Sequence, residues 1–302
     1  MLVGGAAVAA GIAANVASSS NSAGSSDTSH EEKNRPMSDR MPVIFVPHGG
    51  GPYSYVELGF PADEVEDLAS YWRNLAATLP RRPDAVLVVS AHWEEPVPTL
   101  MTTERPPMLY DYYGFPPEAY ELQWPAPGAP ELAGRVRSLL SDAGIATAEN
   151  DERGFDHGTF VPLGRVFPEA EIPTMQLSLK AGLDPEEHLA LGRALAPLRD
   201  EGVLILGSGM SYHNMRGFWR ADAAAHASAF DEWLGDTVTR TSAERDAGLV
   251  AWQDAPMARA VHPREEHLLP LMVIAGAAGD DVGVVPWRGR VSGKAVSAVR
   301  FG

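Results

Sequence analysis

Short β-branched runs alternate with longer amphipathic stretches from Met41 to the end of the chain. Runs such as AVLVVS and VLILGS are apolar without interruption, which is typical of parallel strands that are buried on both faces. The stretches between them repeat apolar residues at helical spacing, and several begin at Pro or follow Asp. The alternation predicts an α/β fold, with a single domain built on a central, mostly parallel sheet that is flanked by helices.

The same pattern places the individual elements. Strands are expected at Val43–Pro47, Ala85–Ser90, Thr174–Leu179, Val203–Gly207, Val282–Pro286 and Ala295–Phe301. Helices are expected at Ala62–Thr78, Pro130–Ala143, Pro185–Arg199, Ala221–Thr239 and Glu265–Ala277. The segment Glu94–Pro127 is dense in Pro, Tyr, Phe and Trp, which predicts a long structured loop that covers another part of the molecule.

The start of the chain has a different composition. Its first 16 residues are small and apolar, and the Ser-rich stretch Ser18–Ser29 that follows lacks the bulky residues of a core. This composition predicts a disordered extension, residues 1–40, before one folded domain, residues 41–302. No Lys or Arg precedes the apolar run, so we expect a cytoplasmic protein, with export through a signal-like segment or a start codon assigned too early as alternatives. No later segment is apolar over the length of a membrane span.

Composition limits the partners and the chemistry. The chain has 302 residues, 45% of them hydrophobic, which is enough for a substantial core. Lys and Arg total 24 against 40 Asp and Glu, and the formal charge of -16 argues against nucleic acid as a partner. The absence of cysteine excludes disulfides, thiolate metal sites and a Cys nucleophile. A metal site here would therefore use His, Asp or Glu.

Three histidines follow expected buried strands. His48 comes after VIFVP, His92 after AVLVVSA and His213 after VLILGSGMSY. In an open α/β sheet the carboxyl ends of the strands form the crevice where ligands bind. We therefore expect these side chains to share a site, although each one alone could be an ordinary turn or core histidine.

Two further histidines are candidates. His267 lies at the start of an apolar helical stretch, where Glu265 and Glu266 could act only as favourable charges at a helix start. His157 lies in GFDHGTF, where Asp156 and the glycines indicate an exposed turn. The remaining histidines are weaker: one in the extension, two on expected solvated helix faces, and one retained only because it lies five residues before His267. These are His30, His188, His226 and His262.

Five ordered motifs together resemble the DOPA-type extradiol dioxygenases of the class III ring-cleaving superfamily. They are HGGGP at His48, SAHW at His92, GFDHG at His157, SYHN at His213 and EHLLP at His267, and the run YDYYGFPPEAYELQWPAPG also agrees. The resemblance extends from Pro42 to Gly302. Two departures concern substrate shape more than metal binding: three glycines follow His48 where the family has a Ser after one Gly, and Phe160 replaces a Trp.

The resemblance implies a metal-dependent enzyme that inserts O₂ to open the ring of a catechol, DOPA-like or related. It implies His48, His92 and His267 as metal ligands, with His213 either a fourth ligand or an acid/base group, and His157 as the other catalytic histidine. Residues of the aromatic loop would bind the substrate and exclude water. These are Tyr112, Tyr113, Phe115 and Trp124.

Histidine ligands that leave open positions suit a redox metal, so Fe(II) is expected for activity. Zn(II) also fits a histidine-rich site and could occupy it in purified protein, but it supplies no redox chemistry. Two alternatives remain: a zinc-dependent hydrolase that uses the same histidines, and a non-catalytic protein that binds a metal or an aromatic compound. The sequence leaves open which catechol is used and which oligomeric state the protein adopts.

Overall fold

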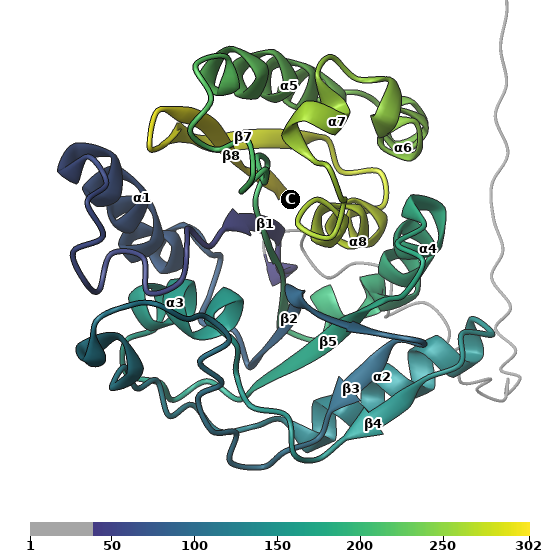
Figure 1. Cartoon of the computed structure of the whole chain (residues 1–302). Coiled ribbons are helices and arrows are strands. Elements are labelled where there is room, and N and C mark those ends of the chain that lie inside the picture. Colours follow the sequence, from purple (N-terminus) through teal and green to yellow (C-terminus); the bar gives the residue numbers. More distant parts are fainter. Residues whose placement is uncertain (1–38) are drawn as a thin grey trace, which may run out of the picture. The chain divides into compact units, whose positions relative to one another are not determined.

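A sheet of eight strands runs through residues 39–302, the part of the chain that this computed structural model describes (Figure 1). Across the sheet the strands follow the order β4-β3-β5-β2-β6-β1-β8-β7. In chain order they are β1 (Val43–Pro47), β2 (Ala85–Glu95), β3 (Thr99–Met101), β4 (Ala148–Asn150), β5 (Thr174–Lys180), β6 (Val203–Gly209), β7 (Gly283–Val291) and β8 (Lys294–Phe301).

The four central strands form the parallel part of the sheet. β5 pairs with β2, β2 with β6, and β6 with β1, all in parallel, whereas β8 is antiparallel to β1 and to β7. β3 is antiparallel to β5 and parallel to β4. Every residue of β1 and of β6 is buried, as the uninterrupted apolar runs predict. The predicted fold class, a single α/β domain with a mostly parallel sheet, is confirmed.

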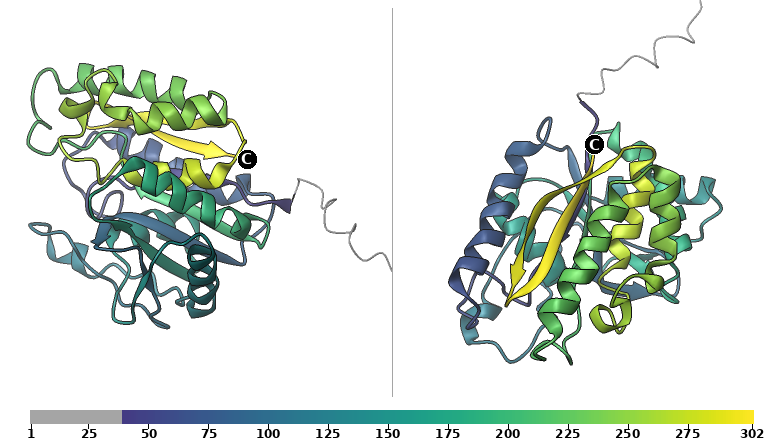
Figure 2. Two further views of the ribbon diagram at one scale, coloured as in Figure 1. Left: turned by 90° about the vertical axis from the view of Figure 1, so that its right-hand side faces the viewer. Right: turned by 90° about the horizontal axis from the view of Figure 1, so that it is seen from above.

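Helices cover both faces of the sheet (Figure 1). The helices α1 and α3 contact each other on one face, and α2, α4 and α8 pack on the other. The hairpin of β7 and β8 lies between α1 and α5 (Figure 2). Their bounds are α1 (Ala62–Leu75), α2 (Pro130–Asp142), α3 (His157–Val166), α4 (Pro185–Leu195), α5 (Ala223–Val238), α6 (Ser242–Val250), α7 (Ala258–Val261) and α8 (Leu269–Ala278).

Several expected boundaries were wrong. The last helix begins at Leu269 rather than Glu265, and the strand expected at Val282–Pro286 runs on to Val291. β2 continues past Ser90 to Glu95, across a register irregularity in its pairing with β5. The pattern missed β3 inside the expected loop, β4 after α2, and the helices α3, α6 and α7. β3 and β4 have only three residues each, and α3 contains Pro162, which normally signals a helix end.

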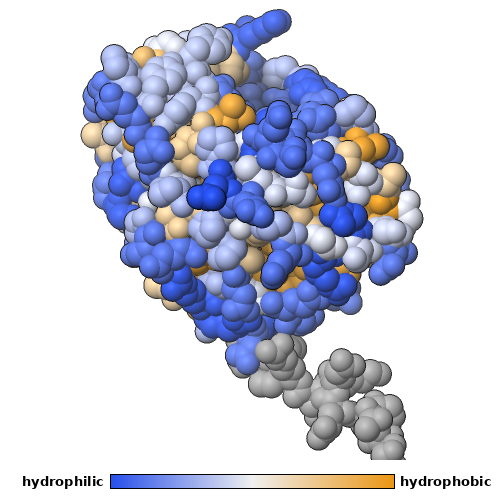
Figure 3. Space-filling view, turned by 90° about the horizontal axis from the view of Figure 1, so that it is seen from below, coloured by the Kyte–Doolittle hydropathy of each residue, from blue (hydrophilic) through white to orange (hydrophobic). Residues whose placement is uncertain are grey.

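Residues 1–38 lie outside the described part of the chain, so the expected N-terminal extension stays a prediction. Within residues 39–302 no helix combines the length and the apolar character that crossing a membrane requires. Polar residues cover most of the face shown in Figure 3, with hydrophobic residues in small separate patches.

Two glycines allow α4 and α8 to pack closely. A Cβ on Gly276 of α8 would lie 2.1 Å from the carbonyl oxygen of Leu189, and a Cβ on Gly192 of α4 would lie 2.0 Å from that of Val273. Both distances are far shorter than van der Waals contact, so neither position has room for a side chain. The close packing seats α8 against the sheet, directly after His267.

We expect Gly276→Ala to lower the free energy of unfolding by about 1–3 kcal/mol, because the added methyl group must push the two helices apart. The matched control is Gly134→Ala in α2, where a Cβ would meet no atom within 4 Å. That change should raise stability by up to about 1 kcal/mol through helix propensity. Urea unfolding of both variants measures the difference, and equal midpoints would contradict the close helix contact.

Candidate metal centre

The parallel strands bring His48 and His92 to one edge of the sheet. β1 and β6 are in register up to Pro47 and Gly209, and the backbone N–H of His48 donates to the carbonyl of Gly209 at 3.2 Å. β2 pairs with the other side of β6 as far as Ser90. His48 lies just beyond its strand, as expected, whereas His92 lies within the extended β2, next to the irregularity in its pairing.

The turn after His48 depends on glycine. Gly49 and Gly51 have φ values of 75° and 55°, which favour glycine. A Cβ on Gly49 would also lie 2.4 Å from the ring of Tyr53, so this position has no room for a side chain. Before the turn, the indole N–H of Trp72 donates to the carbonyl of Pro47 at 3.0 Å. The chain therefore turns sharply while the backbone before His48 stays anchored.

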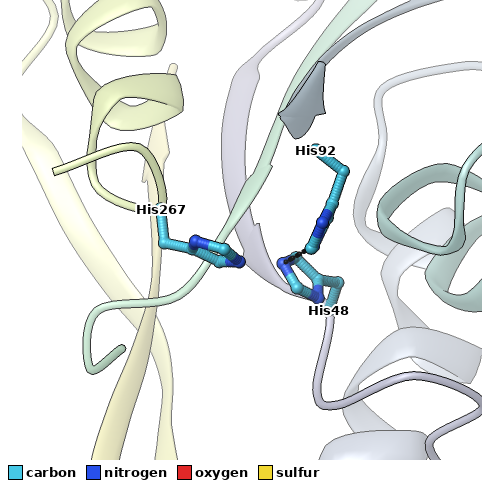
Figure 4. A group of neighbouring side chains, drawn as sticks. All are labelled: His48, His92 and His267. Carbon is cyan, nitrogen blue, oxygen red and sulfur yellow. Dashed lines mark hydrogen bonds between the residues drawn. The ribbon is translucent and has the colours of Figure 1, made fainter. Parts of the chain in front are cut away.

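His48, His92 and His267 converge on one point (Figure 4). One ring nitrogen from each lies within 4.8 Å of the others, and the Nε2 atoms of His48 and His92 are 3.3 Å apart. Two nitrogens on one tetrahedral Zn(II) ion lie roughly 3.3–3.4 Å apart, given bonds of about 2.0–2.1 Å. Nε2 of His267 is buried and has no hydrogen-bond partner. The donor set and this unpartnered nitrogen fit a divalent metal ion.

Burial keeps the three imidazoles neutral. It lowers the pKa of His48, His92 and His267 well below the ordinary value, and the neighbouring histidines lower each pKa further. A metal binds the neutral imidazole and competes with the proton. The three imidazoles therefore have the protonation state that metal binding requires.

Asp111 joins two of the histidines. Its carboxylate meets Nδ1 of His157 at 2.7 Å and Nδ1 of His92 at 3.3 Å, and it also accepts the backbone N–H of His157 at 3.0 Å. Burial would raise the pKa of Asp111, but the hydrogen bonds and charge of His157 outweigh it and bring the pKa to about 2. An ionised carboxylate only accepts hydrogen bonds, so it holds the proton of each ring on Nδ1.

Glu266 does the same for the other two. Its Oε1 atom lies 2.9 Å from Nδ1 of His267 and 3.1 Å from Nδ1 of His213. The rings of His213 and His267 are stacked, with centroids 3.3 Å apart and planes 18° apart. Burial would raise the pKa of Glu266, but the hydrogen bond with His213 leads the effects that lower it overall. Four imidazoles thus meet a carboxylate through Nδ1, which leaves Nε2 as their free nitrogen.

These two carboxylates were missed as site residues. Asp156, which was expected in an exposed turn, is instead fully buried, and its side chain accepts hydrogen bonds from Ser90, Gln176 and Arg153. It anchors the start of α3 to the sheet. Asp111 lies in the aromatic loop, 46 residues from His157, and no local pattern marks it.

The expectation that His157 lies in an exposed turn was wrong. It is the first residue of α3 and is 5% exposed, with its ring centroid 4.0 Å from that of His92. The solvated position expected for His188 was also wrong, because its side chain is 1% exposed and bonds the backbone of Lys180.

His262, the weak candidate, does not reach the centre. It is fully buried, its Nε2 atom bonds the carbonyl of Ser211 at 3.1 Å, and its ring packs edge-on against Phe230. His262 is therefore a core histidine in this fold.

A pocket of about 260 Å³ opens over the centre and is lined by His48, His92, His157, His213 and His267. Its other walls come mostly from the segment after β6 rather than from the aromatic loop. None of the expected substrate-binding residues lines it: Tyr113 is 91% exposed, Trp124 is buried against Phe155, and Tyr112 packs behind His157. Phe115 packs on Gly51, where a Cβ would lie 2.7 Å from its ring. The loop supports the site from behind, because Tyr112, Phe115 and Trp124 are taken up in packing.

Comparison with known proteins identifies the fold and the chemistry. The family model described as the catalytic LigB subunit of aromatic ring-opening dioxygenase matches residues 42–298. This match spans the sheet, the covering helices and all five clustered histidines.

Named relatives agree with the family model. A 4,5-DOPA dioxygenase extradiol of Beta vulgaris is 43% identical over 79% of this chain and 87% of its own length. The protein of the same name from Escherichia coli K12 is 36% identical over 80% of this chain and 86% of its own. The crystal structure of an uncharacterized Escherichia coli K12 protein, 33% identical, superposes with a TM-score of 0.71 over 87% of this chain and all of that one.

Removal of one converging imidazole should empty the metal centre. We expect His48→Ala and His92→Ala each to weaken metal binding by more than the roughly 10–100-fold that loss of a ligand's hydrogen-bond partner costs. The matched control is His226→Ala, which alters a half-buried histidine of α5 that does not line the pocket. Elemental analysis after reconstitution gives the metal content, and circular dichroism checks the fold. Full occupancy in both folded variants would contradict this set of ligands.

Proposed function

The chain belongs to the LigB family of aromatic ring-opening dioxygenases and is an extradiol ring-cleaving dioxygenase, and from this premise we propose that it opens a small catechol at one divalent metal. His48, His92 and His267 would hold the metal. The convergence of their nitrogens inside a pocket carries the proposal. The substrate would be a DOPA-like or related catechol, as the names of the relatives suggest.

Fe(II) is the metal that we propose for activity. Bound there, it would supply open coordination positions and a redox couple, whereas Zn(II) would fit the same nitrogens without redox chemistry. His213 is not part of the converging set of three but joins Glu266 and His267 in a second group. This placement favours His213 as an acid/base residue over a fourth ligand.

His157 is the residue best placed to accept a proton from the catechol. Asp111 holds the proton of the ring on Nδ1, so Nε2 carries the free electron pair. The side chain lines the pocket and is only 5% exposed, so bulk water hardly competes for that nitrogen. A neutral imidazole is suited to accept a phenolic proton near neutral pH.

His213 lines the same pocket and is held by Glu266, whereas His157 is held by Asp111. Glu266 fixes its proton on Nδ1, and stacking on His267 holds the plane of its ring. Its side chain is 25% exposed, so it can exchange protons with solvent. We assign His213 to proton transfer on the side of the pocket that leads to water.

Anaerobic reconstitution with Fe(II) tests the function directly. The Fe(II) protein should take up one O₂ per catechol and form a ring-opened product whose absorption spectrum differs from that of the catechol, because the reaction breaks a ring bond beside a hydroxyl-bearing carbon. The Zn(II) protein, with the same fold and an occupied centre, is the matched control and should consume no O₂. Hydrolysis of an activated ester by the Zn(II) form, with no O₂ uptake by the Fe(II) form, would instead favour a hydrolase.

Substitution of His157 separates proton transfer from metal binding. His157→Gln should keep the metal and bind catechol, yet slow single-turnover O₂ consumption by about 10²- to 10⁴-fold. Metal content and catechol affinity of the same preparation provide the internal control. A wild-type rate would make His157 a structural residue and leave the proton transfer to His213.

A further inference from the structure

The wall of the pocket that faces away from the histidines is apolar. It is lined by Phe60, Met210, Met215, Phe218, Trp219 and Val291. Apart from the histidines, the lining contains no Lys, Arg, Asp or Glu side chain, and Tyr212 supplies its one hydroxyl group. We propose that the catechol taken by this site carries a neutral, apolar ring substituent rather than a charged one; the inference rests on the proposed function and, within its substrate class, favours a related catechol over DOPA itself, whose side chain is charged.

The apolar character continues to the mouth of the pocket. Met215 and Trp219 are 66% and 77% exposed. Large hydrophobic side chains that lie together on a surface commonly mark a binding site, where a ligand shields them from water. Both belong to the same short segment as Phe218 and both line the pocket. A substituent that extends from the ring toward solvent therefore passes over apolar surface.

One buried cation, Lys294, packs against that wall. The ammonium group of Lys294 lies 3.6 Å from the centroid of the Phe218 ring and 4.8 Å from that of Trp219, and it donates to the carbonyl of Ser292 at 2.7 Å. Lys294 is 5% exposed and does not line the pocket. Its contacts hold the aromatic rings in place and leave it out of reach of a substrate carboxylate.

Two acidic side chains beside the pocket are also engaged in hydrogen bonds with other residues. Asp111 and Glu266 bind the Nδ1 atoms of histidines, so neither faces a substrate ammonium group as a free partner. The overall charge of -16 also disfavours the approach of an anionic substrate. A charged substituent would lose water without gaining a partner, whereas each buried methylene would strengthen binding about fourfold.

The test compares three catechols of similar size with the Fe(II) protein under anaerobic conditions. They are 4-propylcatechol, 3-(3,4-dihydroxyphenyl)propionate and dopamine, which differ mainly in the charge at the end of the substituent. Calorimetry should show that 4-propylcatechol binds on the order of tenfold or more tightly than either charged compound. O₂ uptake should give the same order in kcat/KM. Equal affinities, or tighter binding of the carboxylate or the amine, would overturn the proposal.

A charge placed at the mouth checks where the selectivity arises. Met215→Arg should improve binding of the propionate by about two- to fivefold, the range of an exposed ion pair, and leave 4-propylcatechol unimproved. Val250→Arg is the matched control, because Val250 is an exposed apolar residue that does not line the pocket. An equal gain in both variants would mean that net charge, and not the wall, sets the selectivity.

The outcomes separate this inference from the proposed function. If the Fe(II) protein neither binds nor oxidises any of the three catechols, the proposed function fails. If it cleaves them but prefers a charged one, the function stands and only the apolar substrate class is wrong.

Discussion

Five imidazole rings share one small volume, and the centre depends on the three converging rings, those of His48, His92 and His267, remaining neutral there. Neighbouring ring centroids lie between 3.3 and 5.2 Å apart, close enough for two imidazolium ions to repel each other strongly in a buried site. Asp111 and Glu266 each bind two of the rings through Nδ1. Because these four rings face a carboxylate through Nδ1, their Nε2 atoms are left for the interior of the centre. The carboxylates of Asp111 and Glu266 thus set the orientation of four of the five imidazole rings.

The sheet supplies the precision that this arrangement needs. β6 lies between β1 and β2, so the positions of His48 and His92 are tied to one shared strand by regular backbone hydrogen bonds. The third converging histidine enters from the loop before α8, where the backbone N–H of Met210 donates to the carbonyl of His267 at 3.0 Å. α8 itself is seated by its close packing on α4. The spacing of the three converging histidines, which come from three parts of the chain, is therefore controlled by backbone contacts rather than by flexible side chains.

Local pattern predicted the central strands and pointed to the clustered histidines, but it did not point to the carboxylates that contact them. The buried strands predicted the parallel centre of the sheet because apolar runs such as that of β6 have few other uses. Strand ends likewise pointed to His48, His92 and His213. Asp111 could not be found in this way, since its contact with His157 depends on how a 34-residue irregular segment, Glu94–Pro127, folds back. The aromatic residues of that segment predicted a loop that covers the site, whereas its contribution to the centre is the carboxylate of Asp111.

The wall of the pocket was overlooked for a related reason, and its position has a mechanistic consequence. Aromatic residues in a short segment after a strand look like ordinary turn packing, yet residues 210–219 provide most of the wall and also His213. The amide of Asn214 ties this segment to Ala260, and Lys294 holds the ring of Phe218 from the β7–β8 hairpin. A substituent that pushes on Phe218 or Trp219 therefore pushes on the segment that positions His213. Fit of the substituent and alignment of His213, the proposed proton-transfer residue, are therefore coupled through this segment, and a poorly fitting catechol would be expected to react slowly even after it binds.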